Sequence, residues 1–170
     1  MTNTLRTPLR EAAHKLADHW QASGLPSRQE LDAAFENLNH LRKRLNVPGL
    51  WKRSPTMVTA TLDDGIGQGL TVVENCAAAI GIQLISLGVM QKLETICDAC
   101  RRHQPEWLGV TVLQFDTEDE LKWIAQQLPC QTRIVAGGPV FTGDPDFAHR
   151  TGVYYAARNV ADFLQFMLYR

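Results

Sequence analysis

Residues 56–69 read TMVTATLDDGIGQG and contain the transition that decides the fold. A β-rich run at 56–62 leads into a glycine-rich loop, and an apolar helical pattern follows at 70–80. A strand that enters a helix through such a loop predicts the start of a βαβ unit, where a ligand can approach the helix N-terminus. The loop does not match the dinucleotide-binding motif, because Leu70 stands where that motif needs its third glycine. It does not match the phosphate-binding loop either, because no Gly-Lys-Ser/Thr follows.

The same alternation continues to the end of the chain. Further β-rich runs stand at 83–87, 107–113, 132–136 and 152–156, and helical patterns stand at 92–103, 118–128, near 145–150 and at 160–169. Strands that alternate with helices predict an α/β domain with a doubly wound, flavodoxin-like (Rossmann-like) five-stranded parallel sheet, covered on both faces. Ligands of such sheets lie beyond the carboxyl ends of the strands. The loops of interest are therefore 63–69, 87–91, 113–117, 137–143 and 156–159.

Two amphipathic helices are expected before the sheet. Apolar residues recur at helical spacing over 7–23, and a capping-box signature of Ser27 and Glu30 starts a second apolar stripe that ends at Pro48. This pattern divides the chain into a helical region, 1–54, and an α/β domain, 55–170. Two helices alone could hardly bury their stripes, so we expect them to pack on the rest of the chain or to form a homodimer.

Composition and charge exclude some classes of function for this protein. The 170 residues are 45% hydrophobic and 21% charged, as in folded globular proteins, and 17 Lys and Arg against 18 Asp and Glu give a net charge of −1. We therefore expect no direct nucleic-acid partner. Arg42-Lys43-Arg44 is either a solvated helix face or a site for an acidic partner. No apolar run approaches the roughly 18 residues of a membrane span, and no secretion signal is evident, so we expect a cytoplasmic protein.

The cysteines are expected to be reduced thiols, since no export feature accompanies them. They are Cys76, Cys97, Cys100 and Cys130. Cys97 and Cys100, with His103 three residues later, lack a second ligand pair at zinc-finger spacing, so we expect them on the buried stripe of a helix. No nucleophile, base and orienting group are recognisable, and we expect a protein that is not an enzyme.

Taken together, the loops resemble the cobalamin-binding domain of corrinoid proteins, whose pattern is D-x-H-x-x-G, then S-x-L, then G-G. Asp64 and Gly69 match the first element, Thr111-Val112-Leu113 the second, and Gly137-Gly138 the third. Leu87-Gly88-Val89 and the closing Tyr155-Ala156 also look like this family. The resemblance covers residues 56–168.

The resemblance implies a slot between strands one and four for the nucleotide tail of the cofactor, and a histidine that replaces the tail base on cobalt. Ile66 stands where that histidine should be, and a register shifted by two places Asp64 there and Leu62 in the aspartate column, so the ligand is missing either way. A bulky residue at Gly138 should fill the slot and cost little stability if Gly138 has ordinary backbone angles. The resemblance gives these candidate cofactor-binding residues: Asp64, Ile66, Gly69, Leu87, Gly88, Thr111, Leu113, Gly137, Gly138 and Tyr155.

Three interpretations follow from the missing histidine. The domain binds cobalamin base-on or without a protein lower ligand, binds haem in the same cleft, or is a cofactor-free interaction domain. The resemblance implies a tetrapyrrole-binding sensor or regulatory protein that acts through a partner regulator, with a corrinoid methyl carrier for a separate methyltransferase as the alternative. In such sensors helices lie over the macrocycle, which makes candidates of His14, His19, Trp20 and His40. His19 and His40 are the candidate metal ligands, whereas Trp20 lies on the apolar stripe and is expected in the core.

Overall fold

The structure is a computed structural model and describes residues 6–170. Its helices are α1 (Thr7–Ser23), α2 (Arg28–Arg44), α3 (Gln68–Ile80), α4 (Leu93–His103), α5 (Glu118–Gln127), α6 (Val140–Gly143), α7 (Phe147–Thr151) and α8 (Val160–Leu168). Its strands are β1 (Thr56–Thr61), β2 (Gln83–Ser86), β3 (Trp107–Thr111), β4 (Arg133–Gly137) and β5 (Tyr155–Ala157). A short 3₁₀ helix, Phe115–Thr117, precedes α5. None of the described helices is long and apolar enough to span a membrane.

The chain divides into two compact units, each formed by segments that are distant in sequence. The helical unit consists of the described part of Met1–Pro55 together with Val72–Gln83 and Asn159–Arg170. The sheet unit consists of Thr56–Thr71 and Leu84–Arg158. The division at residue 54 that the sequence suggests stays a prediction.

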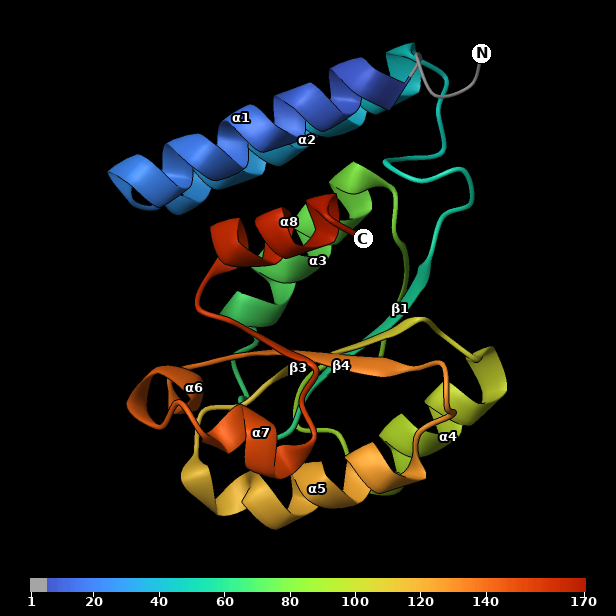
Figure 1. The fold of residues 1–170 in the computed structure, drawn as a ribbon, viewed down its shortest axis with the longest axis vertical. Helices are drawn as coiled ribbons and strands as arrows, with labels where there is room; N and C mark the ends of the chain where they lie inside the picture. Colours follow the sequence, from blue (N-terminus) through green and yellow to red (C-terminus); the bar gives the residue numbers. More distant parts are fainter. Residues whose placement is uncertain (1–5) are drawn as a thin grey trace. The chain divides into compact units, whose positions relative to one another are not determined.

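The sheet has five strands and is parallel, as predicted, and its strand order is β2-β1-β3-β4-β5. Strands β1, β3 and β4 are labelled in Figure 1. Its register places Thr61 opposite Thr111, Thr111 opposite Gly137, and Gly137 opposite Ala157. These four residues therefore form one row at the carboxyl ends of the strands. In a parallel sheet this edge is where the loops to the following helices begin.

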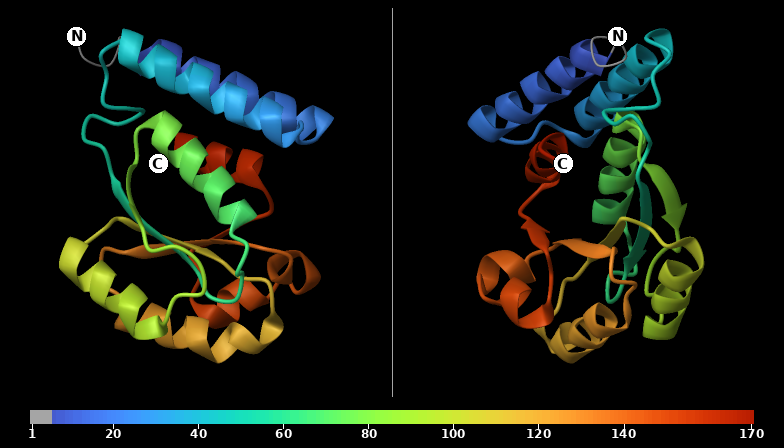
Figure 2. Two further views of the ribbon diagram at one scale, coloured as in Figure 1. Left: turned by 180° about the vertical axis from the view of Figure 1, so that it is seen from behind. Right: turned by 45° about the vertical axis from the view of Figure 1, so that its right-hand side comes forward.

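One face of the sheet carries the core of the sheet unit. Buried branched residues of the strands, such as Val58 and Leu108, pack with Ile124 of α5 and Phe147 of α7. Figure 2 shows α4, α5 and α7 side by side on this face. Residues that point to the opposite face are smaller towards the carboxyl edge, where they are Thr59, Thr61, Gly109, Thr111 and Gly137.

Two of the cysteines, Cys97 and Cys100, match their predicted environment. All four are free, Cys76, Cys97 and Cys100 are buried, and Cys130 is exposed. Cys97 and Cys100 belong to the core under the sheet, which confirms that they lie on the buried stripe of α4. Burial raises the pKa of the Cys100 thiol to about 12, so this group is neutral at physiological pH.

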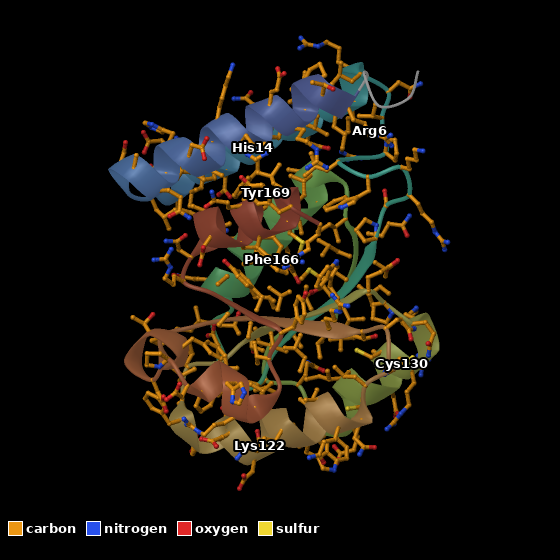
Figure 3. The ribbon with its side chains drawn as sticks, viewed as in Figure 1. Arg6, His14, Lys122, Cys130, Phe166 and Tyr169 are labelled. Atoms are coloured by element: carbon orange, nitrogen blue, oxygen red, sulfur yellow. The ribbon has the colours of Figure 1, made fainter. Side chains whose placement is uncertain are left out.

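The helical unit begins with the two predicted amphipathic helices. Ser27 accepts a hydrogen bond from the Glu30 backbone at 3.3 Å, and the Glu30 carboxylate accepts one from the Ser27 backbone at 2.9 Å, so the capping box is confirmed. Trp20 is buried and meets Phe35 edge to face at 5.8 Å, which confirms its expected place in the core. Helix α1 contacts α8 as well as α2, and His14 meets Tyr169 at 5.5 Å (Figure 3).

Some elements of the structure differ from the sequence prediction. Helix α2 ends at Arg44, because Asn46 has a left-handed φ of +51° that ends the helix before Pro48. Strand β5 begins only at Tyr155, because Gly152 has a φ of +73° and caps α7. The short helix α6 at 140–143, directly after the double glycine, was not predicted.

Arg150 on α7 connects three segments of the sheet unit. Its Nη2 lies 2.9 Å from Oε2 of Glu118 on α5 and 2.7 Å from Oδ2 of Asp144 before α7. Lys122 adds a contact of 2.7 Å to Oε1 of Glu118. Hydrogen bonds from Arg150 and Lys122 lower the pKa of Glu118 to about 2. This cluster holds α7 to α5 at the protein surface.

We expect Arg150→Ala to weaken the pH dependence of stability. A carboxyl group whose pKa is lower in the folded state than in the unfolded state stabilises the fold at pH values above its unfolded pKa. This stabilisation is lost as the pH falls through the folded-state pKa. For Glu118, the pH range over which this stabilisation is lost extends from 4.5 down to about 2. Urea unfolding at pH 7 and pH 3 should give a smaller difference in the variant than in wild type. Arg101→Ala, which removes an exposed ion pair with Asp98, is the control, and equal pH dependence in wild type and Arg150→Ala would contradict the prediction.

Candidate cofactor-binding site

The loops that follow β1, β2, β3 and β4 are hydrogen-bonded to one another at the carboxyl edge of the sheet. The Leu62 amide donates to the Thr111 carbonyl at 3.4 Å, and the Val112 amide donates to the Gly137 carbonyl at 2.9 Å. On the other side of β1, the Thr61 amide donates to the Gly88 carbonyl at 3.1 Å. Four loops predicted from separate parts of the sequence therefore form one continuous rim.

Two consecutive carboxylates shape the loop after β1. Asp63 accepts hydrogen bonds from the backbone of Leu113 at 2.8 Å and of Gln114 at 2.7 Å, and so ties this loop to the loop after β3. Asp64 is 7% exposed, and its Oδ1 accepts from the Ile66 amide at 2.8 Å and the Gly67 amide at 3.0 Å. Both carboxylates thus stabilise the loop, and Asp64 turns the chain so that Ile66 projects from it.

Thr61 connects the loops after β1 and β2. Its hydroxyl donates to the Asp64 carbonyl at 2.5 Å and accepts from the Met90 amide at 2.8 Å. Met90 has a left-handed φ of +49°, which is uncommon for a residue with a side chain. Neither Asp63 nor Met90 was a predicted site residue. Two adjacent acids after a strand were the visible signal for Asp63, while nothing in the sequence indicated the backbone angle of Met90.

Small residues leave open space beside the carboxyl edge. A Cβ built on Gly69, near the start of α3, would have only the methyl group of Thr111 within 4 Å, at 4.0 Å. A Cβ built on Gly137 would meet the carbonyl oxygen of Ala157 at 3.5 Å, an ordinary contact. These three positions, Gly69, Thr111 and Gly137, form a cradle that larger side chains would fill.

Gly138 does not have the ordinary backbone angles on which the stability expectation depends. Its φ is +131°, and a Cβ built on it would lie 1.8 Å from the carbonyl oxygen of Val112. The expectation that a bulky residue there costs little stability therefore does not apply, because its condition of ordinary backbone angles is not met. The glycine is needed for the close approach of two backbones. Gly137 is the member of the pair that can accept a side chain.

The rim carries exposed apolar side chains. Ile66 is 81% exposed, Met90 63% and Phe115 54%, and Val89 and Leu113 are exposed at 38% each. Exposed apolar residues that gather at one edge, rather than singly, indicate a binding surface. The edge thus combines a cradle of small residues with an apolar rim, and both features are typical of a ligand-binding surface.

Other predicted site residues lie in different environments. Leu87 is half-buried against the core of the sheet unit, and Gly88 has a φ of +89° in the same loop. Tyr155 starts β5 opposite Val135, two residues before the row that contains Gly137, so it does not reach the rim through its strand position. Its place in the site stays a prediction.

The predicted metal candidates belong to the helical unit. His19 on α1 and His40 on α2 are exposed. Within residues 6–170, no group of three or more His, Cys, Asp or Glu side chains is arranged to hold a metal ion.

Comparison with known proteins points to one family. A family model described as the B12 binding domain matches residues 55–162. No curated protein matches the chain. A cobalamin-binding protein from Desulfitobacterium hafniense DCB-2 superposes with a TM-score of 0.78 at 21% identity, over 95% of this chain and 79% of that chain.

Two structures from Methanosarcina barkeri are also similar. The monomethylamine corrinoid protein has a TM-score of 0.61 at 17% identity, with 92% of this chain and 77% of that chain covered. The methanol:cobalamin methyltransferase complex has a TM-score of 0.67 at 17% identity, with 97% of this chain and 65% of that chain covered, less than two thirds of its length. At such identities the likeness establishes the fold.

Proposed function

This chain belongs to the B12-binding domain family, and on that basis we propose that its sheet unit binds a cobalamin-type corrinoid without a histidine ligand. The family match confirms the resemblance drawn from the loops. We further propose that the protein is a sensor or regulatory module that acts through a protein partner, and is not itself a catalyst. When bound, the corrinoid supplies a cobalt centre whose redox state and outer ligand change with conditions, which is the property a sensor needs.

The cradle supports binding of the nucleotide tail. Gly69, Thr111 and Gly137 would hold the tail, because they leave space where larger side chains would block the backbone. Thr111 and Gly137 are direct neighbours across β3 and β4, so the space lies along one row of the sheet. This open row is the single observation that carries the proposal. It suits cobalamin better than haem, which has no such tail.

The loop after β1 supports a coordination without histidine. Ile66, at the position of the family's histidine, presents a hydrocarbon side chain that cannot ligate cobalt. Asp64 is engaged with the backbone amides of Ile66 and Gly67, and carboxylate is a hard donor that suits cobalt in a corrin poorly. Methyl carriers depend on the histidine to tune cobalt, and its absence favours the regulatory proposal over the methyl-carrier alternative.

A direct test is titration of the purified protein with hydroxocobalamin and, separately, with hemin. We expect cobalamin to co-elute with the protein in gel filtration at a ratio of one to one, and hemin not to co-elute. Binding of hemin alone would favour the haem interpretation, and binding of neither would favour a cofactor-free interaction domain. Transfer of the methyl group from protein loaded with methylcobalamin to the acceptor substrate of an added methyltransferase would instead identify a carrier. A homodimer through α1 and α2, and the identity of the partner, stay predictions.

We expect Ile66→His to restore the family's coordination. The side chain at 66 is exposed, so an imidazole fits without repacking, and Oδ2 of Asp64 accepts no hydrogen bond from the described residues. This oxygen is available to orient the imidazole. The variant should bind cobalamin about tenfold more tightly. Electron paramagnetic resonance of the Co(II) form, with labelled histidine, should show a protein nitrogen on cobalt. The same nitrogen signal in the wild-type protein would mean that the family's histidine motif does not align with the loop that contains Ile66.

A further inference from the structure

A soft donor atom lies beside the position where the family has histidine. The Sδ atom of Met90 is 3.2 Å from the place that a Cβ on Gly65 would occupy. Gly65 directly precedes Ile66, and Met90 is 63% exposed. The thioether therefore lies over the loop after β1 and is open to a ligand at the rim.

The main chain of Met90 is held at a defined point. Its amide donates to the hydroxyl of Thr61 at 2.8 Å, and the Gln91 amide donates to the Thr61 carbonyl at 2.8 Å. Thr61 is fully buried at the end of β1. Together with the left-handed φ of +49°, these bonds fix where the flexible Met90 side chain begins. The thioether can then adjust its own position by rotation about three bonds.

The other donor atoms of these loops are less suitable. Both oxygens of Asp63 accept hydrogen bonds from the backbone of the loop after β3. Asp64 is nearly buried and serves the backbone of its own loop. Within residues 6–170, the loops at this edge contain no histidine or cysteine. A thioether is a soft donor that ligates macrocyclic metals in proteins, as methionine does for haem iron.

Building on the proposed function, we propose that the thioether of Met90 is the protein's axial donor to the corrinoid cobalt, in place of the family's imidazole. The absence of a side chain at Gly65 keeps the space that the sulfur occupies. Met90 and Gly65 thus act as a pair, and a change at either one should alter the coordination. Ile66 would contact the macrocycle through its hydrocarbon side chain only.

The test labels the donor atom directly. The protein is produced with ⁷⁷Se-selenomethionine, loaded with hydroxocobalamin, freed of excess by gel filtration and reduced to the Co(II) form. Electron paramagnetic resonance then shows which nucleus is bound to cobalt. The chain has four methionines, so Met90→Leu identifies which of them gives the signal. Gly65→Ala keeps the sulfur but moves it, because the added Cβ meets only the Met90 side chain within 4 Å.

We expect a ⁷⁷Se splitting in wild type, its loss in Met90→Leu and its reduction in Gly65→Ala, with cobalamin binding about tenfold weaker in Met90→Leu. Met167→Leu is the control, because it makes the same substitution at a buried methionine of α8, outside the candidate site, and keeps the Met90 sulfur. It should retain the splitting. Circular dichroism of each apo variant checks that it is folded.

Two kinds of failure are distinguishable. Three results would overturn the inference on Met90 and leave the proposed function standing, provided that cobalamin co-elutes. These are a nitrogen splitting on cobalt, the absence of a selenium splitting, and a selenium splitting that persists in Met90→Leu. If no cobalamin co-elutes with the wild type, both the proposed function and this inference are overturned.

Discussion

Gly138→Ala is expected to lower the free energy of unfolding by about 3 to 5 kcal/mol, since it combines a backbone clash with an unfavourable φ. The added Cβ would lie 1.8 Å from the Val112 carbonyl oxygen and 2.8 Å from its carbon. A backbone carbonyl cannot rotate away as a side chain can. The Val112 amide is also bonded to the Gly137 carbonyl at 2.9 Å, so the ends of β3 and β4 would have to separate.

Gly137→Ala is the matched control. It adds the same methyl group one residue earlier, where the nearest atom is 3.5 Å away and φ is not positive. We expect its stability to stay within about 1 kcal/mol of wild type. Urea unfolding followed by circular dichroism measures both. If the two variants were equally stable, Gly138 would not have the backbone conformation described here.

Local patterns in the sequence predicted the architecture well. The alternation of β-branched runs with amphipathic helices was sufficient for the order of elements, because each strand and helix must bury its own apolar face. The Ser27–Glu30 capping box marked the start of α2 correctly, since such a cap depends only on residues three apart. Trp20 was correctly placed in the core by its helical spacing.

The details of the candidate site depend on contacts that local patterns do not contain. Asp63 bonds to the backbone of Leu113, fifty residues away, and this contact exists only once the sheet has formed. The requirement for glycine at position 138 arises from the Val112 carbonyl, which lies directly after β3. The two glycines of the pair look alike in sequence, yet Gly138 is required by the fold, whereas a side chain at Gly137 would make only one ordinary contact. The position of the Met90 sulfur likewise depends on Gly65 and on the hydroxyl of Thr61.

The difference between the two glycines makes Gly137→Leu the decisive variant for the proposed cofactor. Gly137 ends β4 opposite Thr111, and its missing side chain would project from the same face of the sheet. Since a Cβ there makes only one ordinary contact, the variant should fold. The remaining carbons of leucine would then occupy the cradle. We expect cobalamin binding to fall by about 100-fold or more, because the branched leucine side chain would fill the space beside β4 that the nucleotide tail needs.

Ligands that lack the nucleotide tail provide the control for this prediction. Cobinamide has the corrin ring and cobalt of cobalamin but no nucleotide tail, and hemin has neither corrin nor tail. If the tail occupies the cradle, Gly137→Leu should lose cobalamin and keep whatever affinity wild type has for cobinamide. Equal loss of both would mean that leucine disturbs the ring site or the fold, which the unfolding curve separates. Unchanged cobalamin binding would show that the tail stays outside, with its base on cobalt, and would leave no axial position for Met90 on that side of the ring.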